Sequence, residues 1–281
     1  ERITGLHFFN PVDRMPLVEV IAGPQSSESA VATTYKLALK LGKTPILVGD
    51  CPGFLVNRLL AFYLGESLHL HEEGVPISRI DKLFKQFGMP MGPFALLDQI
   101  GLDVAEKVTK MVGDAYGDRL PTQTRVTSLV KQGKLGKKSG SGFYDYDSKG
   151  KPRPGKESVK RSASFNDHQI LHRPLYAMVN EAARCLDEGV ARRALDVDLG
   201  MVMGTGFPPF RGGLLRWADS IGVDQIITEL VDWSPTEDRF TPSRALEIRR
   251  SGFYEESASA SIEDEELLSG DVSGGTPTGE V

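Results

Sequence analysis

The stretch TPILVGDCPGFLVNR, residues 44–58, marks the point at which one kind of architecture gives way to another. Its first part, Thr44 to Val48, is short, apolar and rich in β-branched residues, which predicts a strand. Its second part predicts the start of a helix, because Asp50 is a suitable N-cap and Pro52 suits the first helical turn. The chain before this stretch mixes strands with a helix, whereas the chain after it has a helical pattern.

Residues 1–50 form an incomplete α/β unit in this interpretation. Strands are expected over Ile3–Phe9 and Leu17–Ile21, and the spacing of apolar residues predicts a helix over Ser27–Leu41. Strands alternating with helices are typical of α/β domains. Fifty residues are too few for a complete doubly wound domain, so this segment is interpreted as the C-terminal remnant of one. Because the chain opens at Glu1 without an initiator methionine, we expect a fragment of a longer protein.

The remainder of the chain is predicted to form two helical blocks joined by a linker. The first block covers residues 51–146 and the second covers residues 165–253. Residues 147–164 between them are polar, basic and rich in Pro, Gly and Ser, which is typical of a linker. Residues 254–281 are rich in Ser, Gly and acidic residues, and we expect them to be disordered.

The second helical block repeats the first at four landmarks that follow one another in the same order. The matched pairs are Glu73-Gly74-Val75 with Glu188-Gly189-Val190, Asp81 with Asp196, Gly88-Met89-Pro90 with Gly206-Phe207-Pro208, and residues 98–103 with residues 219–224. This agreement predicts a duplicated helical domain. We expect the two copies to pack on each other, so that each buries the apolar face that the other exposes.

The composition excludes several classes of protein. The whole chain has a net charge of −5, but eight acidic residues lie after residue 254, so residues 1–254 alone carry +3. This positive charge is far less than a nucleic-acid-binding surface needs. The longest apolar runs are too short for a membrane-spanning helix. Cys51 and Cys185 are too few and too far apart for a disulfide framework, and they predict reduced thiols in a cytoplasmic or similar compartment. The spacing of Cys and His indicates no metal site.

His7 is the first candidate for chemistry, because it stands at the end of a predicted strand. Ligands of open α/β sheets bind beyond the carboxyl ends of the strands, and an imidazole there can transfer a proton near neutral pH. The alternative is a buried histidine that is only hydrogen-bonded to a backbone carbonyl.

Glu19 is the second candidate, because aliphatic residues flank it on both sides in the strand Leu17–Ile21. A buried carboxylate needs a partner, and His7 on the adjoining predicted strand is the nearest in sequence. Such a carboxylate would orient the imidazole and stabilise its protonated form. The alternative is an edge strand from which Glu19 points into water.

Asn57 is the third candidate. It is expected in the second turn of the helix that begins near Pro52, where asparagine is unfavourable. A residue that opposes the local preference suggests a function, here donation of a hydrogen bond to a carbonyl or an oxyanion. The alternative is an exposed asparagine on the helix surface.

Several motifs together resemble the 3-hydroxyacyl-CoA dehydrogenase family. They are HFFNP (residues 7–11), LVEVI (residues 17–21), DCPGFLVNR (residues 50–58) and GKKSGSGFY (residues 136–144). The order of the motifs and the spacings from histidine to glutamate and to asparagine also match the family. The resemblance covers about residues 1–253.

This resemblance implies an NAD-dependent enzyme of fatty acid β-oxidation that converts L-3-hydroxyacyl-CoA to 3-oxoacyl-CoA. It assigns His7 as general base or acid on the 3-hydroxyl group, Glu19 as the residue that orients His7, and Asn57 as a ligand of the 3-oxygen. The implied fold is mostly α: a remnant of a Rossmann NAD-binding domain followed by two tandem helical C-terminal-type domains. The family's glycine-rich phosphate loop and its active-site serine are not found in this sequence.

The tandem second copy resembles the multifunctional members of the family. We therefore expect a parent protein like the alpha subunit of a fatty-acid-oxidation complex, with an enoyl-CoA hydratase domain before residue 1 and a thiolase-type beta subunit as partner. The second copy has no His–Glu pair before it and is expected to be structural, standing where a partner subunit stands in dimeric members.

Two other hypotheses remain open from the sequence. The first is a non-catalytic scaffold or interaction module that binds acyl-CoA. The second is a different dehydrogenase with a Rossmann domain followed by helices, which would use a lysine or a cysteine in its site; Cys51 is the only nearby candidate.

Overall fold

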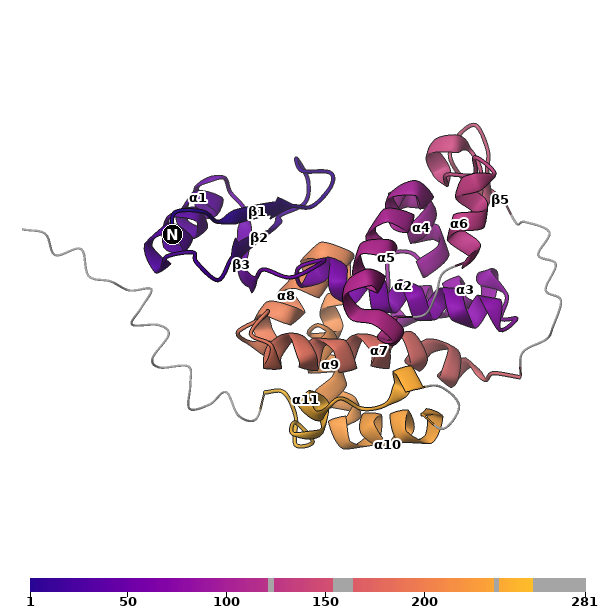
Figure 1. Cartoon of the computed structure of the whole chain (residues 1–281). Coiled ribbons are helices and arrows are strands. Elements are labelled where there is room, and N and C mark those ends of the chain that lie inside the picture. Colours follow the sequence, from indigo (N-terminus) through magenta and orange to yellow (C-terminus); the bar gives the residue numbers. More distant parts are fainter. Residues whose placement is uncertain (121–123, 154–163, 235–237, 255–281) are drawn as a thin grey trace, which may run out of the picture.

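The computed structural model describes residues 1–120, 124–153, 164–234 and 238–254 (Figure 1). Most of these residues are helical, and a small sheet stands at the N-terminal end, so the expected fold class is confirmed. The central part of the expected linker and almost all of the expected acidic tail lie outside the described residues.

The N-terminal unit is a three-stranded sheet covered on one face by a helix. Strand β1 (Gly5–Phe8) pairs antiparallel with β2 (Leu17–Ala22), which pairs in parallel with β3 (Thr44–Gly49). Helix α1 (Glu28–Lys40) connects β2 to β3, and its N-cap is Ser27. Alternate residues of a strand face opposite sides of a sheet. One side of the sheet therefore packs against α1 and the other against the helical body.

The first helical copy begins immediately after β3. Its elements are α2 (Val56–Glu72), α3 (Ile77–Phe87), α4 (Pro93–Ile100), α5 (Leu102–Tyr116), the short helix η1 (Gly117–Arg119), α6 (Thr124–Lys131), the short helix η2 (Lys137–Ser139), and the strands β4 (Asp145–Tyr146) and β5 (Pro152–Arg153). The last two strands form a small hairpin. The first residues of the expected linker are therefore part of this hairpin.

The second helical copy follows the same order of elements. It consists of α7 (Asp167–Asp187), α8 (Ala194–Thr205), the short helix η3 (Pro209–Arg211), α9 (Leu214–Ile221), α10 (Val223–Trp233), the short helix η4 (Asp238–Phe240) and α11 (Arg244–Glu247). Helices α2 and α7 pack along each other at the centre of the molecule (Figure 1). Buried residues of both copies and of the sheet join into one large hydrophobic core.

Glycines at equivalent positions confirm the predicted duplication. Gly88 and Gly206 both end their helices in the left-handed conformation, with φ of 116° and 76°. Gly101 and Gly222 both stand between two consecutive helices, with φ of 100° and 97°. A side chain at φ values in this range would be strained, so these landmarks recur in the sequence because the backbone turns in the same way in both copies.

One predicted landmark was wrong by two residues. Asp81 accepts hydrogen bonds from the N–H groups of Phe94 and Ala95 at the start of α4, at 2.9 and 3.1 Å. The residue that does the same for α9 is Asp198, and not Asp196, which instead pairs locally with Arg193. The sequence spacing misled because α8 begins two residues farther from the preceding glycine than α3 does, while the capping aspartate holds the same position within each helix.

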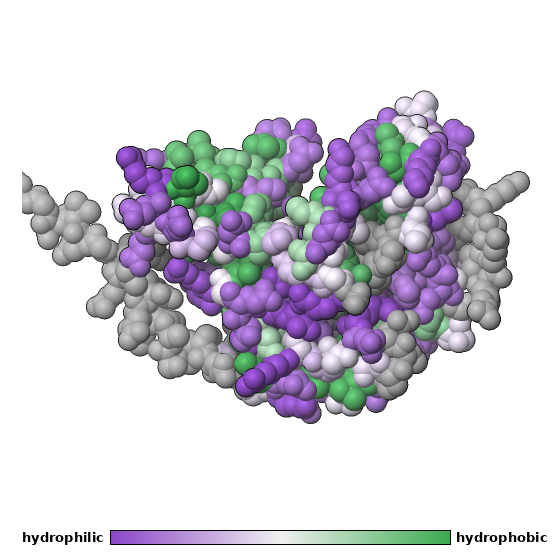
Figure 2. All heavy atoms as spheres, in the orientation of Figure 1, coloured by the Kyte–Doolittle hydropathy of each residue, from purple (hydrophilic) through white to green (hydrophobic). Residues whose placement is uncertain are grey.

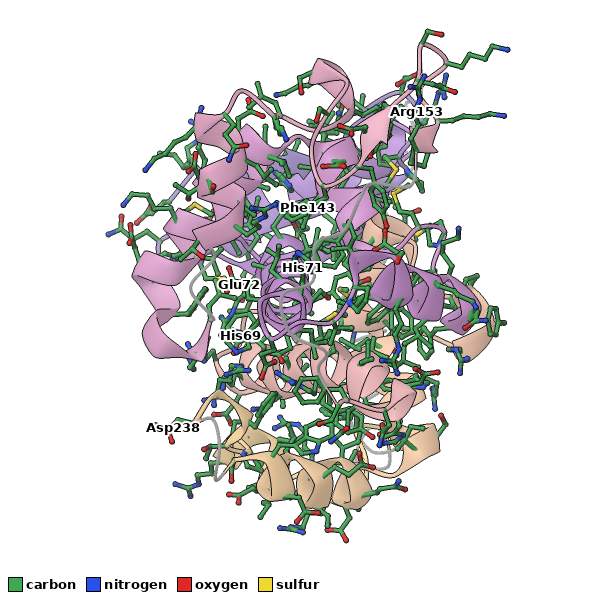
Figure 3. All side chains as sticks on the ribbon, turned by 90° about the vertical axis from the view of Figure 1, so that its right-hand side faces the viewer. His69, His71, Glu72, Phe143, Arg153 and Asp238 are labelled. Carbon is green, nitrogen blue, oxygen red and sulfur yellow. The ribbon has the colours of Figure 1, made fainter. Side chains whose placement is uncertain are left out.

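The sequence comparison missed a fifth landmark. Both copies end in the sequence Ser-Gly-Phe-Tyr, at residues 141–144 and 251–254. In the first copy, Phe143 N–H donates to Asp98 at 2.9 Å, and the Tyr144 hydroxyl donates to Asp81 at 2.9 Å. In the second copy, Phe253 N–H donates to Asp219 at 2.8 Å, and the Tyr254 hydroxyl donates to Asp198 at 2.5 Å. Figure 3 shows Phe143 within the first copy, where its ring packs against Phe94. Each motif is therefore hydrogen-bonded to two aspartates of its own copy and holds the end of that copy against its helices.

The two copies are joined by buried ion pairs that repeat with the same symmetry. Arg58 on α2 binds Glu181 and Glu188 at the far end of α7, and Arg173 on α7 binds Glu66 and Glu73 at the far end of α2. The short helices add one arginine each, Arg119 to Glu181 and Arg239 to Glu66. Such reciprocal contacts are typical of a two-fold interface between identical chains. Here they occur within one chain.

Candidate active site

Glu19 is fully buried in the middle of β2, so the alternative of a carboxylate in water is excluded. Its Oε1 atom accepts hydrogen bonds from the N–H groups of Leu55 and Val56, each at 3.0 Å, at the start of α2. Its Oε2 atom is buried without a hydrogen-bond partner. The sequence therefore identified the need for a partner correctly but missed the one that the structure shows, the N-terminus of α2, which favours negative charge.

His7 lies directly opposite Glu19 in the antiparallel pair of β1 and β2. Directly opposed residues present their side chains on the same face of a sheet. The imidazole is half-buried, and its ring contacts Phe9 and Phe54 with centroids 5.0 and 5.4 Å away. No hydrogen bond joins His7 to Glu19 in this structure, so the expected His–Glu interaction stays a prediction.

The Nε2 atom of His7 lies 3.3 Å from Nδ2 of Asn57. An amide nitrogen only donates, so Nε2 accepts in this arrangement, and the proton of the neutral ring is then on Nδ1. Burial lowers the pKa of His7, which favours the neutral imidazole that a general base requires. The structure thus places two of the three candidate side chains in contact.

Asn57 stands in the first turn of α2 rather than in the second. The helix begins at Val56, and residues 52–55 form a turn before it, so the prediction that Asp50 is the N-cap was wrong. No side chain of the adjacent sequence caps α2, and the carboxylate of Glu19 binds its first N–H groups from the sheet instead. An N-cap that comes from a distant strand has no signal in the local sequence.

Phe54 is a functional candidate that the sequence analysis did not single out. Its φ of 48° is in the left-handed region, and it is the only residue other than glycine with such a value in the described part of the chain. A bulky residue in this region is strained, and such strain is concentrated at functional sites. Here the strained turn brings the Phe54 ring against His7.

Cys51 and Tyr116 stabilise the same turn through hydrogen bonds to its backbone. The Cys51 thiol donates to the carbonyl of Phe54 at 3.2 Å, and the Tyr116 hydroxyl donates to the carbonyl of Pro52 at 3.0 Å. Both contacts are made to the backbone and not to the side chains of the site. The structure therefore gives Cys51 a role in the turn, which disfavours the hypothesis of a cysteine-dependent dehydrogenase.

Burial raises the pKa of Glu19 to about 7, although the hydrogen bonds from Val56 and Leu55 oppose this shift. Near neutral pH the carboxylate is therefore poised between its two forms. A positive charge on the imidazole opposite would favour the ionised form, because opposite charges at short range stabilise each other.

The second copy packs against the strands and the helix that carry the site residues. Helix α8 packs beneath β2 and β3, and Gly200 and Gly204 on it leave room for residues of the sheet and of α2. A Cβ atom at Gly204 would lie 2.9 Å from the Leu17 side chain and 3.0 Å from that of Val56. The N–H of Gly49 donates to the carbonyl of Val190 at 2.9 Å. The strand that leads into the site is therefore hydrogen-bonded to the second copy.

The residues that the structure describes do not provide a complete site for a dinucleotide. A pyrophosphate site needs a glycine-rich turn between a strand and the N-terminus of a helix. The described strand-to-helix connections hold instead the Ser27 cap and the 52–55 turn. In the described part of the chain, no group of His, Cys, Asp and Glu could hold a metal ion, and no helix is long and apolar enough to cross a membrane.

Comparison with known proteins connects this geometry to a family. The model of the 3-hydroxyacyl-CoA dehydrogenase NAD binding domain matches residues 1–51. The model of the C-terminal domain of the same family matches residues 53–146 and again residues 170–247, one match for each helical copy. The matched segments cover well over half of the chain.

Curated relatives agree with these matches. The fatty acid oxidation complex subunit alpha of Pseudomonas savastanoi pv. phaseolicola is 42% identical over 259 residues, which are 88% of this chain and 36% of that protein. The subunit of the same name from Pseudomonas syringae pv. tomato is 45% identical over 240 residues, which are 81% of this chain and 33% of that protein. The chain thus spans about a third of the length of these relatives.

Solved structures show the same arrangement. A 3-hydroxybutyryl-CoA dehydrogenase from Escherichia coli is 27% identical, with a TM-score of 0.76 over 89% of this chain and 70% of that one. The dehydrogenase part of a multifunctional enzyme from C. elegans is 34% identical, with a TM-score of 0.64 over 87% of this chain and 59% of that one. From the family models, the relatives and the shared fold together, this chain belongs to the 3-hydroxyacyl-CoA dehydrogenase family.

Proposed function

We propose that the complete protein oxidises L-3-hydroxyacyl-CoA to 3-oxoacyl-CoA with NAD, as an enzyme of fatty acid β-oxidation. The observation that carries the proposal is the contact of 3.3 Å between His7 Nε2 and Asn57 Nδ2, with the buried carboxylate of Glu19 opposite His7 in the sheet. A base, an amide donor and a carboxylate on one side of the sheet are the groups that deprotonation of a secondary alcohol needs.

In this proposal, the substrate hydroxyl group takes the place that the amide of Asn57 now has beside His7. Nε2 of His7 removes the hydroxyl proton, and Nδ2 of Asn57 donates a hydrogen bond to the 3-oxygen as it becomes a carbonyl. NAD, when bound, would accept the hydride that leaves C3 in the same oxidation. In this proposal, Nδ1–H of His7 donates a hydrogen bond to the unpartnered Oε2 atom of Glu19, whose negative charge stabilises the imidazolium. The buried carboxylate thus acts through His7 and not on the substrate.

The first test replaces His7 by alanine in a protein in which a complete nucleotide-binding half precedes residues 1–281. The rate of NAD reduction with 3-hydroxybutyryl-CoA is expected to fall by about 10³-fold or more, because general base catalysis and substrate orientation are lost together. Replacement of His168, an exposed histidine of the second copy, is the control and is expected to leave the rate unchanged. An unchanged rate in the His7 variant would favour the scaffold hypothesis.

The second test uses residues 1–281 alone. This polypeptide is expected to bind NAD very weakly and to show little or no turnover, because its described strand-to-helix turns offer no pyrophosphate site. Equilibrium dialysis or calorimetry with NAD measures the binding. Tight binding, or clear oxidation of 3-hydroxybutyryl-CoA by this polypeptide, would contradict the expectation.

We also propose that the complete protein is the alpha subunit of a fatty acid oxidation complex, with a thiolase-type beta subunit as partner. The names of the curated relatives and the tandem helical copies support this proposal. A cytoplasmic location is proposed with it. The free thiols of Cys51 and Cys185 support a reducing compartment. Copurification of a thiolase with the complete protein from its source tests the partnership.

A further inference from the structure

The side chain of Arg58 joins the first turn of α2 to the second helical copy. It is fully buried, and its Nε atom donates to Glu181 Oε1 at 2.7 Å. Its two terminal nitrogens donate to both carboxylate oxygens of Glu188, at 2.6 and 3.1 Å. A guanidinium group held by two carboxylates through such a planar set of bonds has little freedom to move.

Arg58 directly follows Asn57 and is tied to the turn before α2. Its backbone N–H donates to the carbonyl of Gly53 at 3.0 Å. Its guanidinium group lies over the ring of Tyr116, 4.2 Å from the centroid, and the hydroxyl of that ring holds the carbonyl of Pro52. The turn is therefore connected to the second copy through one buried side chain.

We propose that Arg58 is a positioning residue of the active site, through which Glu181 and Glu188 of the second copy hold in place the turn at residues 52–55 and the first two residues of α2 (together called the 52–57 turn). That turn presents the amide that contacts His7 and the two N–H groups that bind the buried carboxylate. The second copy thereby acts on a site to which it contributes no catalytic group. The inference rests on the proposed dehydrogenase function, but its structural part is measured without activity.

The chain contains a matched control for this role. Arg173 binds the equivalent pair, Glu66 and Glu73, at the opposite end of the same helix pair: its Nε atom donates to Glu66 and one terminal nitrogen donates to Glu73, each at 2.7 Å. Glu73 lies about four turns beyond Arg58, roughly 22 Å along the axis of α2. Equivalent substitutions at the two ends weaken the interface in the same way, but only those at Arg58 and its partners reach the 52–57 turn.

The structural test compares Glu188→Gln with Glu73→Gln in residues 1–281. Both carboxylates are partly exposed, at 44% and 28%, so both variants are expected to fold. Hydrogen exchange at the amides of Leu55 and Val56 is expected to become about tenfold faster in Glu188→Gln and to stay unchanged in Glu73→Gln, because loss of one charged hydrogen bond loosens the turn locally. Equal exchange in the two variants would overturn the proposal.

The kinetic test uses Arg58→Lys and Arg173→Lys in the protein with a complete nucleotide-binding half. Arg58→Lys is expected to lower kcat roughly 10- to 100-fold while KM changes less than about threefold, because a misplaced amide and carboxylate act on the reacting atoms. Arg173→Lys is expected to keep kcat within about twofold, since it lies far from the turn. Urea unfolding of both variants compares their stabilities.

The outcomes separate this inference from the proposed function. If His7→Ala has no effect on the rate, the proposed function fails, whereas the exchange result at Leu55 and Val56 still decides whether Arg58 holds the turn. If His7→Ala abolishes activity and the variants of Arg58 and Arg173 lose kcat equally, the dehydrogenase function stands and the positioning role is overturned.

Discussion

At the scale of single residues, Glu19 connects the sheet to the helical body. One oxygen of its carboxylate binds two N–H groups at the start of α2, and the other has no partner. A buried carboxylate with an unpartnered oxygen destabilises the fold, and it is retained where the charge has a use. We interpret this unpartnered oxygen as the acceptor of a hydrogen bond from His7 during the reaction.

Because the pKa of Glu19 is raised, we expect the stability of the protein to depend on pH. The pKa is about 7 in the folded protein and near 4.5 in the unfolded chain, so the folded state holds the proton more tightly. The free energy of unfolding is therefore expected to fall as the pH rises from about 4.5 to about 7. Glu19→Gln lacks this titrating group, so its free energy of unfolding should not fall in this way. The difference in the free energy of unfolding, variant minus parent, should therefore increase by roughly 2 kcal/mol from pH 5 to pH 8.

Urea unfolding at pH 5, 6, 7 and 8 measures this difference. Glu28→Gln, an exposed substitution at the start of α1, is the control and should show no comparable trend. The same Glu19 variant in a protein with a complete nucleotide-binding half is expected to lose activity, because an amide cannot stabilise the imidazolium. A constant stability difference across the pH range would show that Glu19 does not carry a raised pKa.

At the scale of elements, a buried aspartate caps one helix in each copy. Asp81 binds the first N–H groups of α4 and the hydroxyl of Tyr144, and burial raises its pKa to about 6. Asp198 holds α9 and the hydroxyl of Tyr254 in the same way. Each aspartate joins the middle of its copy to the closing Gly-Phe-Tyr motif. These two residues therefore maintain the fold of their copies and are not candidates for catalysis.

Removal of either cap is expected to destabilise the protein. Asp81→Ala removes the hydrogen bonds to two N–H groups at the start of α4 and to the hydroxyl of Tyr144, which costs about 2 kcal/mol or more. Asp198→Ala is expected to have a similar effect in the second copy. Tyr144→Phe, which removes only one of these bonds, should cost about 1 kcal/mol. Thermal and urea unfolding measure these effects, and an effect of Asp81→Ala no larger than that of Tyr144→Phe would contradict the capping role.

Helices α3 and α8 occupy equivalent positions but have different surroundings. The outer side of α8 carries Leu199, Val202 and Met203, which pack against the core beside the sheet. The corresponding side of α3 carries Lys82, Lys85 and Gln86, which are exposed on an open surface groove. The hairpin strand that ends at Arg153 borders this groove (Figure 3). The difference follows from the position of the three-stranded sheet, which packs on α8 and leaves the equivalent side of α3 exposed and polar.

At the scale of the whole molecule, the two copies form an interface of the kind that two identical subunits form. The ion pairs of α2 with α7 are reciprocal, and a partly enclosed cavity of about 60 Å³ lies between the two clusters, lined by Glu66, Arg119, Glu181 and Arg239 among others. This volume is enough for a few water molecules. The duplication thus provides, within one chain, reciprocal contacts of the kind that two identical subunits make.

The interface predicts how the first copy behaves alone. Residues 1–153 lack α7, so Arg58 and Glu66 would be left without their partners and an apolar face of α2 would be exposed. In a dimer of this fragment, Arg58 of each chain can bind Glu66 and Glu73 of the other, as Arg173 does here. We expect residues 1–153 to dimerise. Sedimentation equilibrium measures the state, and Arg58→Glu is expected to abolish the dimer; a stable monomer would contradict this.

The N-terminal unit exposes several large apolar side chains. Figure 2 shows hydrophobic residues gathered over the lobe formed by β1 and α1. Its large exposed apolar residues include Ile3, Leu37, Leu39 and Leu41, and Ile3 is 83% exposed. Contiguous apolar surface of this kind marks an interface. We expect the rest of the nucleotide-binding domain to cover it in the complete protein.

The sequence by itself determined the fold class, the duplication and the identity of the candidate residues. Strand and helix periodicity, glycines that require positive φ, and a carboxylate among aliphatic residues are local signals, and each has a physical cause that acts within a few residues of the chain. His7 and Glu19 could be predicted as neighbours because they stand on adjoining strands. The match of Asp81 with Asp196 failed because sequence spacing does not show which carboxylate reaches the next helix.

Only the tertiary structure decided how these residues are held. The N–H groups that bind Glu19 come from a helix more than thirty residues away, and the carboxylates that bind Arg58 come from the other copy. Hydrogen bonds and ion pairs depend on distance in space, and a local pattern carries no information about partners that meet only when the chain has folded. For the same reason, the strained turn at Phe54 and the reciprocal ion pairs of α2 and α7 were not predicted.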